Sequence, residues 1–148
     1  MTRSTDAPTT FGPQLIGRTE KALNALLDRQ LAGTGITEPQ WVTLTLTVTS
    51  GGTLTGDALL ARISDALKVD EADARRRVAE LAAAGLVRTT GNTIAATERG
   101  EAQWREVRET INQITPKLWG DLPEAELTIA GRVLNAVLAR ANALLSAA

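Results

Sequence analysis

The chain lacks three residue types on which much protein chemistry depends. Its 148 residues include no histidine, no cysteine and no tyrosine. Without cysteine there are no disulfides, thiol redox switches or cysteine zinc sites, and without histidine the commonest metal ligand and general base are missing. No glycine-rich motif for holding phosphate is present either. The sequence therefore predicts no metal site and no cofactor.

Catalysis by the remaining residues would need two carboxylates that face each other across a cleft. Glu71 and Asp73 are close in sequence, but two residues at this spacing point to different sides of a helix. We therefore expect no catalytic residues and no enzymatic activity.

Long apolar runs and a strong charge of one sign are also absent. No run approaches the ~18 residues of a membrane span, and the N-terminal residues lack the charged-then-apolar order of a secretion signal. Sixteen basic and seventeen acidic residues leave a net charge of -1, so a nucleic-acid site must be local. These features predict a cytoplasmic protein that does not contact membranes.

The N-terminal region predicts a short arm followed by a helix. Residues 1–12 are rich in Thr, Ser and Pro without an apolar period, which is typical of a disordered arm. The rest of the chain, residues 13–148, is expected to form a single domain. Residues 13–31 carry a helical apolar stripe, which ends at the glycines of residues 32–35.

The next segment carries conflicting signals. Thr37, Pro39 and Gln40 form a helix start, with a capping threonine, a proline in the first turn and a glutamine that closes a capping box. Residues 42–48, however, alternate between leucine or valine and threonine as a strand does. We predict a helix, because the start signal is specific and the apolar residues also fit a helical face.

Two short helices and a hairpin follow. Thr55 is expected to cap a helix that runs to residue 67, and Asp70 a helix over residues 71–84 that Gly85 ends. Strands over residues 86–90 and 93–97 then flank a two-residue loop. This order predicts a winged helix-turn-helix lobe over residues 36–100.

The C-terminal third has a different pattern. Apolar residues recur at heptad spacing from Glu101 to residue 118, and again over residues 127–144. Pro116 should kink or divide the first of these helices. Such apolar helices near a chain end are most simply buried against a second subunit. The sequence thus predicts a mainly α fold with a small β-hairpin, in which residues 13–33 and 101–148 form a helical dimerisation region.

The helix over residues 71–84 carries three consecutive arginines. On a helical wheel its buried face is apolar, so Arg76 points away from it with small alanines nearby. Arginine contacts to guanine in the major groove are the commonest specific contacts of such helices, and we assign Arg75 and Arg76 to DNA. Arg77 is nearer the buried edge and is expected to pair with an acidic neighbour. An ordinary solvated helix face is the simpler alternative.

The order of these elements resembles the MarR family of bacterial transcription regulators. The motifs that carry the resemblance are Thr37-Glu38-Pro39-Gln40-Trp41, Ala84-Gly85-Leu86-Val87-Arg88 and Thr97-Glu98-Arg99-Gly100. The resemblance implies a homodimer whose first and last helices interlock, with two lobes that bind double-stranded DNA at a pseudo-palindromic operator. In many members a small-molecule effector binds between the lobe and the dimer region.

The resemblance also implies site residues. Its recognition-helix positions correspond to Ala72, Asp73, Arg75 and Arg76, and Thr55 and Arg62 are expected to contact phosphates. The hairpin is shorter than is common in the family, which leaves Arg88 at its base and Asn92 at its tip as candidates. The candidate pocket residues are Trp41, Trp104 and Trp119.

One alternative to a DNA-binding regulator stays open at this point. A winged-helix module that binds a protein or a ligand, without specific DNA reading, would also account for the neutral lobe and the short hairpin.

Overall fold

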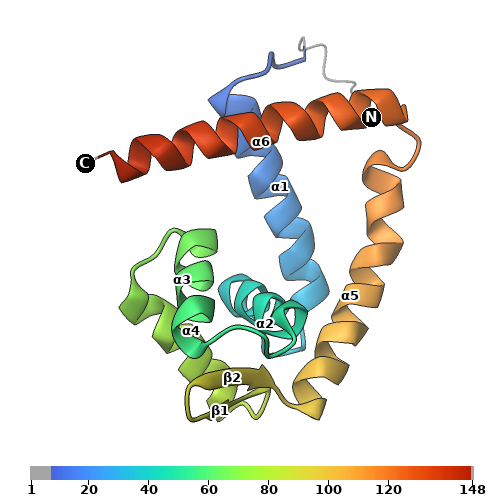
Figure 1. Cartoon of the computed structure of the whole chain (residues 1–148). Helices are drawn as coiled ribbons and strands as arrows, with labels where there is room; N and C mark the ends of the chain where they lie inside the picture. Colours follow the sequence, from blue (N-terminus) through green and yellow to red (C-terminus); the bar gives the residue numbers. More distant parts are fainter. Residues whose placement is uncertain (1–7, 148) are drawn as a thin grey trace. The chain divides into compact units, whose positions relative to one another are not determined.

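The computed structural model describes residues 8–147, and Figure 1 shows a mainly helical fold with one small hairpin. The elements are α1 (Pro13–Leu31), α2 (Glu38–Ser50), α3 (Gly56–Leu67), α4 (Glu71–Ala83), β1 (Val87–Thr90), β2 (Thr93–Ala96), α5 (Glu98–Trp119) and α6 (Glu124–Ser146). The predicted fold class is confirmed. Of the predicted N-terminal arm, residues 1–7 lie outside the described residues.

The chain divides into two compact units, one ending at Ile111 and the other beginning at Asn112. In the first unit α2, α3 and α4 pack against one another, and the hairpin lies against them (Figure 1). Apolar side chains from all of these elements form one core, with Leu44, Leu59, Ile63 and Leu81 almost completely buried. We call α2, α3, α4 and the hairpin together the lobe.

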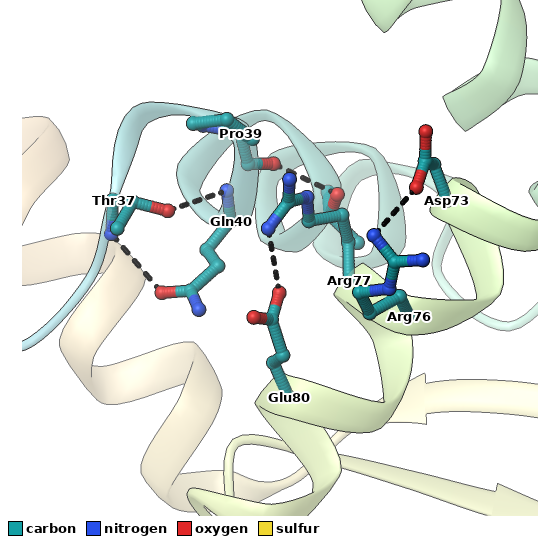
Figure 2. Close-up of polar contacts among 8 residues, drawn as sticks. Thr37, Pro39, Gln40, Asp73, Arg76, Arg77 and Glu80 are labelled. Carbon is teal, nitrogen blue, oxygen red and sulfur yellow. Dashed lines mark hydrogen bonds and ion pairs between the residues drawn. The ribbon is translucent and has the colours of Figure 1, made fainter. Parts of the chain in front are cut away.

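The start of α2 settles the conflict between helix and strand. The Gln40 backbone N–H donates to the Thr37 hydroxyl at 3.4 Å, and the Thr37 N–H donates to the Gln40 side-chain oxygen at 3.0 Å (Figure 2). Both halves of the capping box are therefore present, and they satisfy donors that a helix start leaves free. The predicted helix is confirmed over Glu38–Ser50.

Two threonines of α2, Thr43 and Thr47, do not point to solvent, as they would on one face of a strand. Thr43 and Thr47 are 0% and 1% exposed. Their hydroxyls donate to the carbonyls of Pro39 and Thr43, each at 2.8 Å, so neither is buried without a partner. An alternation of Thr and Leu thus fits a buried helix, because the helix itself accepts the threonine hydrogen bonds.

The hairpin is short and tied to α3. Val87 pairs with Ala96 and Thr90 with Thr93, which leaves the predicted two-residue loop, Gly91-Asn92. Gly91 has φ +58°, and Asn92 is not among the described residues with positive φ, so the loop follows the type II′ pattern. At the tip, the Asn92 carbonyl accepts a 2.7 Å hydrogen bond from the Gly56 N–H at the first turn of α3.

A second close contact joins the end of α4 to the start of α5. The Thr97 hydroxyl donates to the Gly85 carbonyl at 2.7 Å and accepts from the Gly100 N–H at 3.0 Å. Gly100 is buried against the Leu86 backbone, and a Cβ at this position would lie 1.9 Å from the Leu86 carbonyl oxygen. The motif Thr97-Glu98-Arg99-Gly100 therefore combines a helix cap with a close backbone approach.

Helix α5 runs without interruption through Pro116, so of the two predicted effects of this proline, a kink or a division of the helix, the division does not occur. Pro116 lies in the last turn of α5, which ends three residues later at Trp119, so the helix loses one backbone hydrogen bond near its C-terminus. On the lobe side, Val107 is buried in the core, and Trp104 and Ile111 pack against it. This part of the heptad pattern therefore faces the lobe core of its own chain.

In the second unit α6 has no buried residue. Eight of its large apolar side chains are 36–77% exposed: Leu127, Ile129, Val133, Leu134, Val137, Leu138, Leu144 and Leu145. Single exposed apolar residues are ordinary, but a helix with this many presents a continuous apolar surface.

Candidate nucleic-acid interface

Helix α4 is the element on which the sequence analysis placed the DNA contacts. Its cap is the one predicted, because the Asp70 carboxylate accepts from the Asp73 N–H at 2.8 Å. Ala74, Val78 and Leu81 are 0%, 7% and 1% exposed and attach the helix to the lobe core. Because these residues fix one face inward, the opposite face of α4 is presented to solvent.

That outer face holds arginines in ion pairs with acids of the same helix. Arg76 Nη1 lies 2.7 Å from Asp73 Oδ1 (Figure 2), and Arg75 Nη2 lies 2.7 Å from Glu71 Oε1. Arg75 also lies 3.9 Å from Asp57 of α3. The two arginine side chains are 58% and 62% exposed, so they stay accessible to a ligand while paired.

Arg77 differs from its two neighbours. Its side chain is 29% exposed, and its Nη1 lies 3.0 Å from Glu80 Oε1 (Figure 2). Glu80 and Gln40 line the same small cavity, so this ion pair belongs to the side of α4 near the start of α2. The predicted pairing of Arg77 with an acidic neighbour is confirmed.

The charge on α4 has a consequence for binding. With its cap residue the helix carries four acids, namely Asp70, Glu71, Asp73 and Glu80, against three arginines, a formal charge of -1. A helix of this charge does not attract DNA phosphates through its net field. Any preference of α4 for DNA must come from directed contacts of individual side chains.

The other candidate DNA contacts lie on elements around α4. Thr55 caps α3 by accepting from the Ala58 N–H at 3.2 Å. Since Gly56 bonds to Asn92, the structure brings Thr55 and Asn92 together at one end of the lobe. Ala72, Arg62 and Arg88 are exposed, and neither Arg62 nor Arg88 has an acidic partner within residues 8–147.

Sequence reasoning missed one participant, the backbone of the hairpin tip. Its carbonyl, rather than the Asn92 side chain, makes the contact with α3. The two-residue loop and the glycine after Thr55 were visible in the sequence. Their pairing was not, since no local pattern reports a hydrogen bond between residues 36 positions apart.

Of the three tryptophans proposed as pocket residues, two stack on each other in the first unit and the third belongs to the second unit. Trp41 and Trp104 stack with ring centroids 6.4 Å apart, and the Trp104 indole N–H donates to the Thr45 hydroxyl at 3.1 Å. Trp41 is 7% exposed and belongs to the lobe core. Trp119 belongs to the other unit and is 42% exposed. A pocket role for the three tryptophans stays a prediction.

A cavity of about 630 Å³ lies between the second half of α1 and the start of α2. Asn24, Asp28, Ile36 and Glu38 are among the residues that line it. Burial raises the pKa of the Glu38 carboxyl above its ordinary value, and the carboxylates of Glu20 and Asp28 raise that pKa further. The ionised form of the Glu38 carboxyl is thus disfavoured at the edge of this cavity.

We expect Glu38→Gln to stabilise the protein at pH 7 by less than about 1 kcal/mol, since the group is only partly buried. Because folding raises the pKa of Glu38, its ionisation opposes folding: the cost is absent below the unfolded pKa and is complete above the folded pKa. The gain should therefore disappear near pH 4, about where a free Glu titrates. Thermal unfolding at both pH values, with the exposed Glu109→Gln as control, checks this. A gain in stability that is equal at both pH values would contradict this prediction.

Within residues 8–147, no group of three or more acidic side chains is placed to hold a metal ion. None of the helices that the structure describes is long and apolar enough to span a membrane.

Comparison with known proteins relates the fold to solved structures. No protein-family model and no curated protein sequence matches the chain. A MarR-family transcriptional regulator from Silicibacter pomeroyi matches with a TM-score of 0.75 and 22% identity, covering 87% of this chain and 88% of its own. A MarR protein from Peptoclostridium difficile matches with a TM-score of 0.73 and 17% identity, covering 94% and 95%.

A third similar structure is CouR from Rhodococcus jostii, solved with p-coumaroyl-CoA bound. It matches with a TM-score of 0.73 and 18% identity, covering 84% of this chain and 89% of its own. At these identities the likeness establishes the arrangement of the elements, and it confirms the fold expected from the sequence resemblance.

Proposed function

We propose that this chain, which has the fold of the MarR-family regulators, is a DNA-binding transcription regulator. It binds double-stranded DNA as a homodimer, with α4 of each subunit in the major groove of one half-site. The observation that carries the proposal is the outer face of α4. Arg75 and Arg76 are accessible there, on a helix fixed to the lobe core by its opposite face.

The elements around α4 support this orientation. A recognition helix needs neighbouring elements that contact the DNA backbone on either side of the groove. Arg62 of α3 and Arg88 of β1 are exposed and free of acidic partners among the described residues, so they are available for phosphates. In this arrangement unpaired arginines bind the backbone, and the paired arginines of α4 contact bases.

The homodimer is supported by α6. The eight exposed apolar side chains of this helix are the kind of surface that obligate subunit interfaces cover. A second copy of the chain would bury them and would also supply a second α4. Two identical lobes related by a two-fold axis require a pseudo-palindromic site with half-sites about 34 Å apart.

A small-molecule effector that releases the DNA is also part of the proposal. The cavity between α1 and α2, about 630 Å³, lies within the size range of small-molecule sites. CouR, which has the same fold, holds p-coumaroyl-CoA in its structure. The carboxyl groups at this cavity favour a ligand with a neutral or cationic group near Glu38.

Selection of bound duplexes from a random pool tests the DNA-binding function. The expected result is an enriched sequence with two inverted half-sites at one-turn spacing. Recovery of duplexes with no common sequence would reject a sequence-specific regulator. The same experiment returns the operator and its symmetry, so it also bears on the dimer.

Arg76→Ala should weaken binding to the selected duplex by about 1–3 kcal/mol and relax the preference at one base pair of each half-site. Arg62→Ala should instead weaken binding to every duplex and lower the salt slope by about one unit, because phosphate contacts carry no sequence information. Fluorescence anisotropy at several salt concentrations distinguishes the effects of these two substitutions. Arg105→Ala, an exposed arginine of α5, is the control. Binding that is unchanged by Arg76→Ala would contradict the assignment of α4.

A second candidate function is a winged-helix module that binds a protein or ligand without reading DNA. The ion pairing of all three arginines of α4 favours it, and so does the hairpin tip, which is bonded to α3. This candidate predicts that anisotropy detects only weak binding of equal strength to all duplexes.

A further inference from the structure

We infer that Asp73 is a specificity-determining residue of α4, which holds the Arg76 guanidinium for a guanine and penalises binding to other DNA. The inference rests on the proposed function and assigns a role within it. It starts from the distance of 2.7 Å between Asp73 Oδ1 and Arg76 Nη1.

The Asp73 side chain is a fixed support. Its backbone is held by the bond from its N–H to the Asp70 carboxylate, at 2.8 Å, and its short side chain has few rotamers. Its side chain is 35% exposed, against 62% for Glu71, which pairs with Arg75. Arg76 is therefore anchored to a shorter and less exposed partner than Arg75 is.

Anchoring one corner of a guanidinium orients the whole group, because the group is planar and rigid. The bond to Asp73 occupies Nη1, which leaves the N–H groups on the remaining edges for a ligand. Guanine offers two acceptors, O6 and N7, which a suitably oriented arginine can bind together. The pair Asp73–Arg76 thus presents a preformed donor edge to one base.

The Asp73 carboxylate also lowers the affinity of α4 for DNA of any sequence. When no guanine lies opposite Arg76, the pair brings a negative charge toward the phosphates without a compensating contact. Because α4 has a formal charge of -1 with its cap, such complexes gain little from α4. Asp73 should therefore lower the affinity for unrelated duplexes more than for the operator.

The test compares Asp73→Asn with Glu71→Gln. Both variants remove one negative charge from the first turn of α4, and both acids pair with an arginine 2.7 Å away. Affinities are measured by anisotropy for the selected duplex and for a scrambled duplex. Thermal unfolding of both variants controls for the loss of an acid near the helix N-terminus.

For Asp73→Asn we expect tighter binding to the scrambled duplex and a roughly tenfold fall in the ratio of specific to scrambled affinity, since one base contact is worth about this much. For Glu71→Gln both affinities should rise together, with a ratio that changes less than about twofold. In an Arg76→Ala background, Asp73→Asn should no longer change the ratio, because the arginine that it positions is absent.

Three outcomes decide the question. A ratio that is unchanged by Asp73→Asn, or lowered equally by Glu71→Gln, overturns the role of Asp73 and leaves the proposed function intact. An effect of Asp73→Asn that persists in the Arg76→Ala background also overturns it, because Asp73 would then act without Arg76. If the unmodified protein itself shows no preference for any duplex, the proposed function fails first and this inference fails with it.

Discussion

Gly100→Ala should lower the free energy of unfolding of the lobe by about 3 kcal/mol, at the upper end of the cost of overpacking. The added Cβ would lie 1.9 Å from the Leu86 carbonyl oxygen and 2.9 Å from its carbonyl carbon. Both are backbone atoms, which no change of side-chain rotamer can move. Relief therefore requires α5 to shift from Leu86, which breaks the hydrogen bonds of Thr97 to Gly85 and Gly100.

Urea denaturation measures this loss, and Gly17→Ala provides the matched control. Gly17 lies within α1, and a Cβ there meets nothing within 4 Å. Alanine at that position should stabilise the protein by roughly 0.5–1 kcal/mol through its helix propensity. Equal stabilities of the two variants would show that the approach of Gly100 to Leu86 is not a constraint on the fold.

The double substitution Leu134→Glu with Leu138→Glu should convert the proposed dimer into monomers. It places two charges at adjacent turns of the exposed apolar surface of α6, and burying them against another subunit is unfavourable. Each lobe would then bind its half-site alone. Losing the linkage of two half-sites should weaken operator binding by a factor on the order of 10²–10⁴.

Sedimentation equilibrium and anisotropy together check this prediction. The control is Asn135→Glu with Ala139→Glu, which adds the same charge one position along, about 100° around α6 from the two leucines. The control should stay dimeric and bind normally. If the leucine variant remains a dimer, α6 is not the interface and its apolar residues need another explanation.

Local sequence signals predicted most of the lobe, because its helices begin at side chains that cap them. Thr37, Thr55 and Asp70 each accept the backbone hydrogen bond that the pattern predicted. For α2 the capping box was the better guide, although the alternation of Thr and Leu favoured a strand. The threonine hydroxyls bond to carbonyls of the preceding turn, so their polarity says nothing about which side of α2 faces solvent.

The ion pairs of α4 were only partly predicted. The pairing of Arg77 was expected from its position at the buried edge, but no ion pair of Glu71 or Asp73 was predicted. Their spacings to Arg75 and Arg76, four and three residues, are those of neighbours on a helix surface, so these pairs could have been found. An acidic side chain near a helix start can pair with an arginine and at the same time complement the helix dipole.

Other features lie beyond local patterns. Proline usually interrupts a helix, but Pro116 lies in the last turn of α5, which continues past it to Trp119. The buried and exposed faces of the helices could be inferred from periodicity, whereas the contact between Gly56 and Asn92 depends on how the hairpin folds back in three dimensions.

The hairpin tip also has a practical consequence for protein engineering. Exposed two-residue loops are normally good places to insert a tag or an epitope, because such loops tolerate extra residues. Here the Asn92 carbonyl completes the first turn of α3 by accepting from Gly56. A longer loop would draw this carbonyl away and leave the Gly56 N–H without its acceptor. This exposed turn is therefore a poor insertion site.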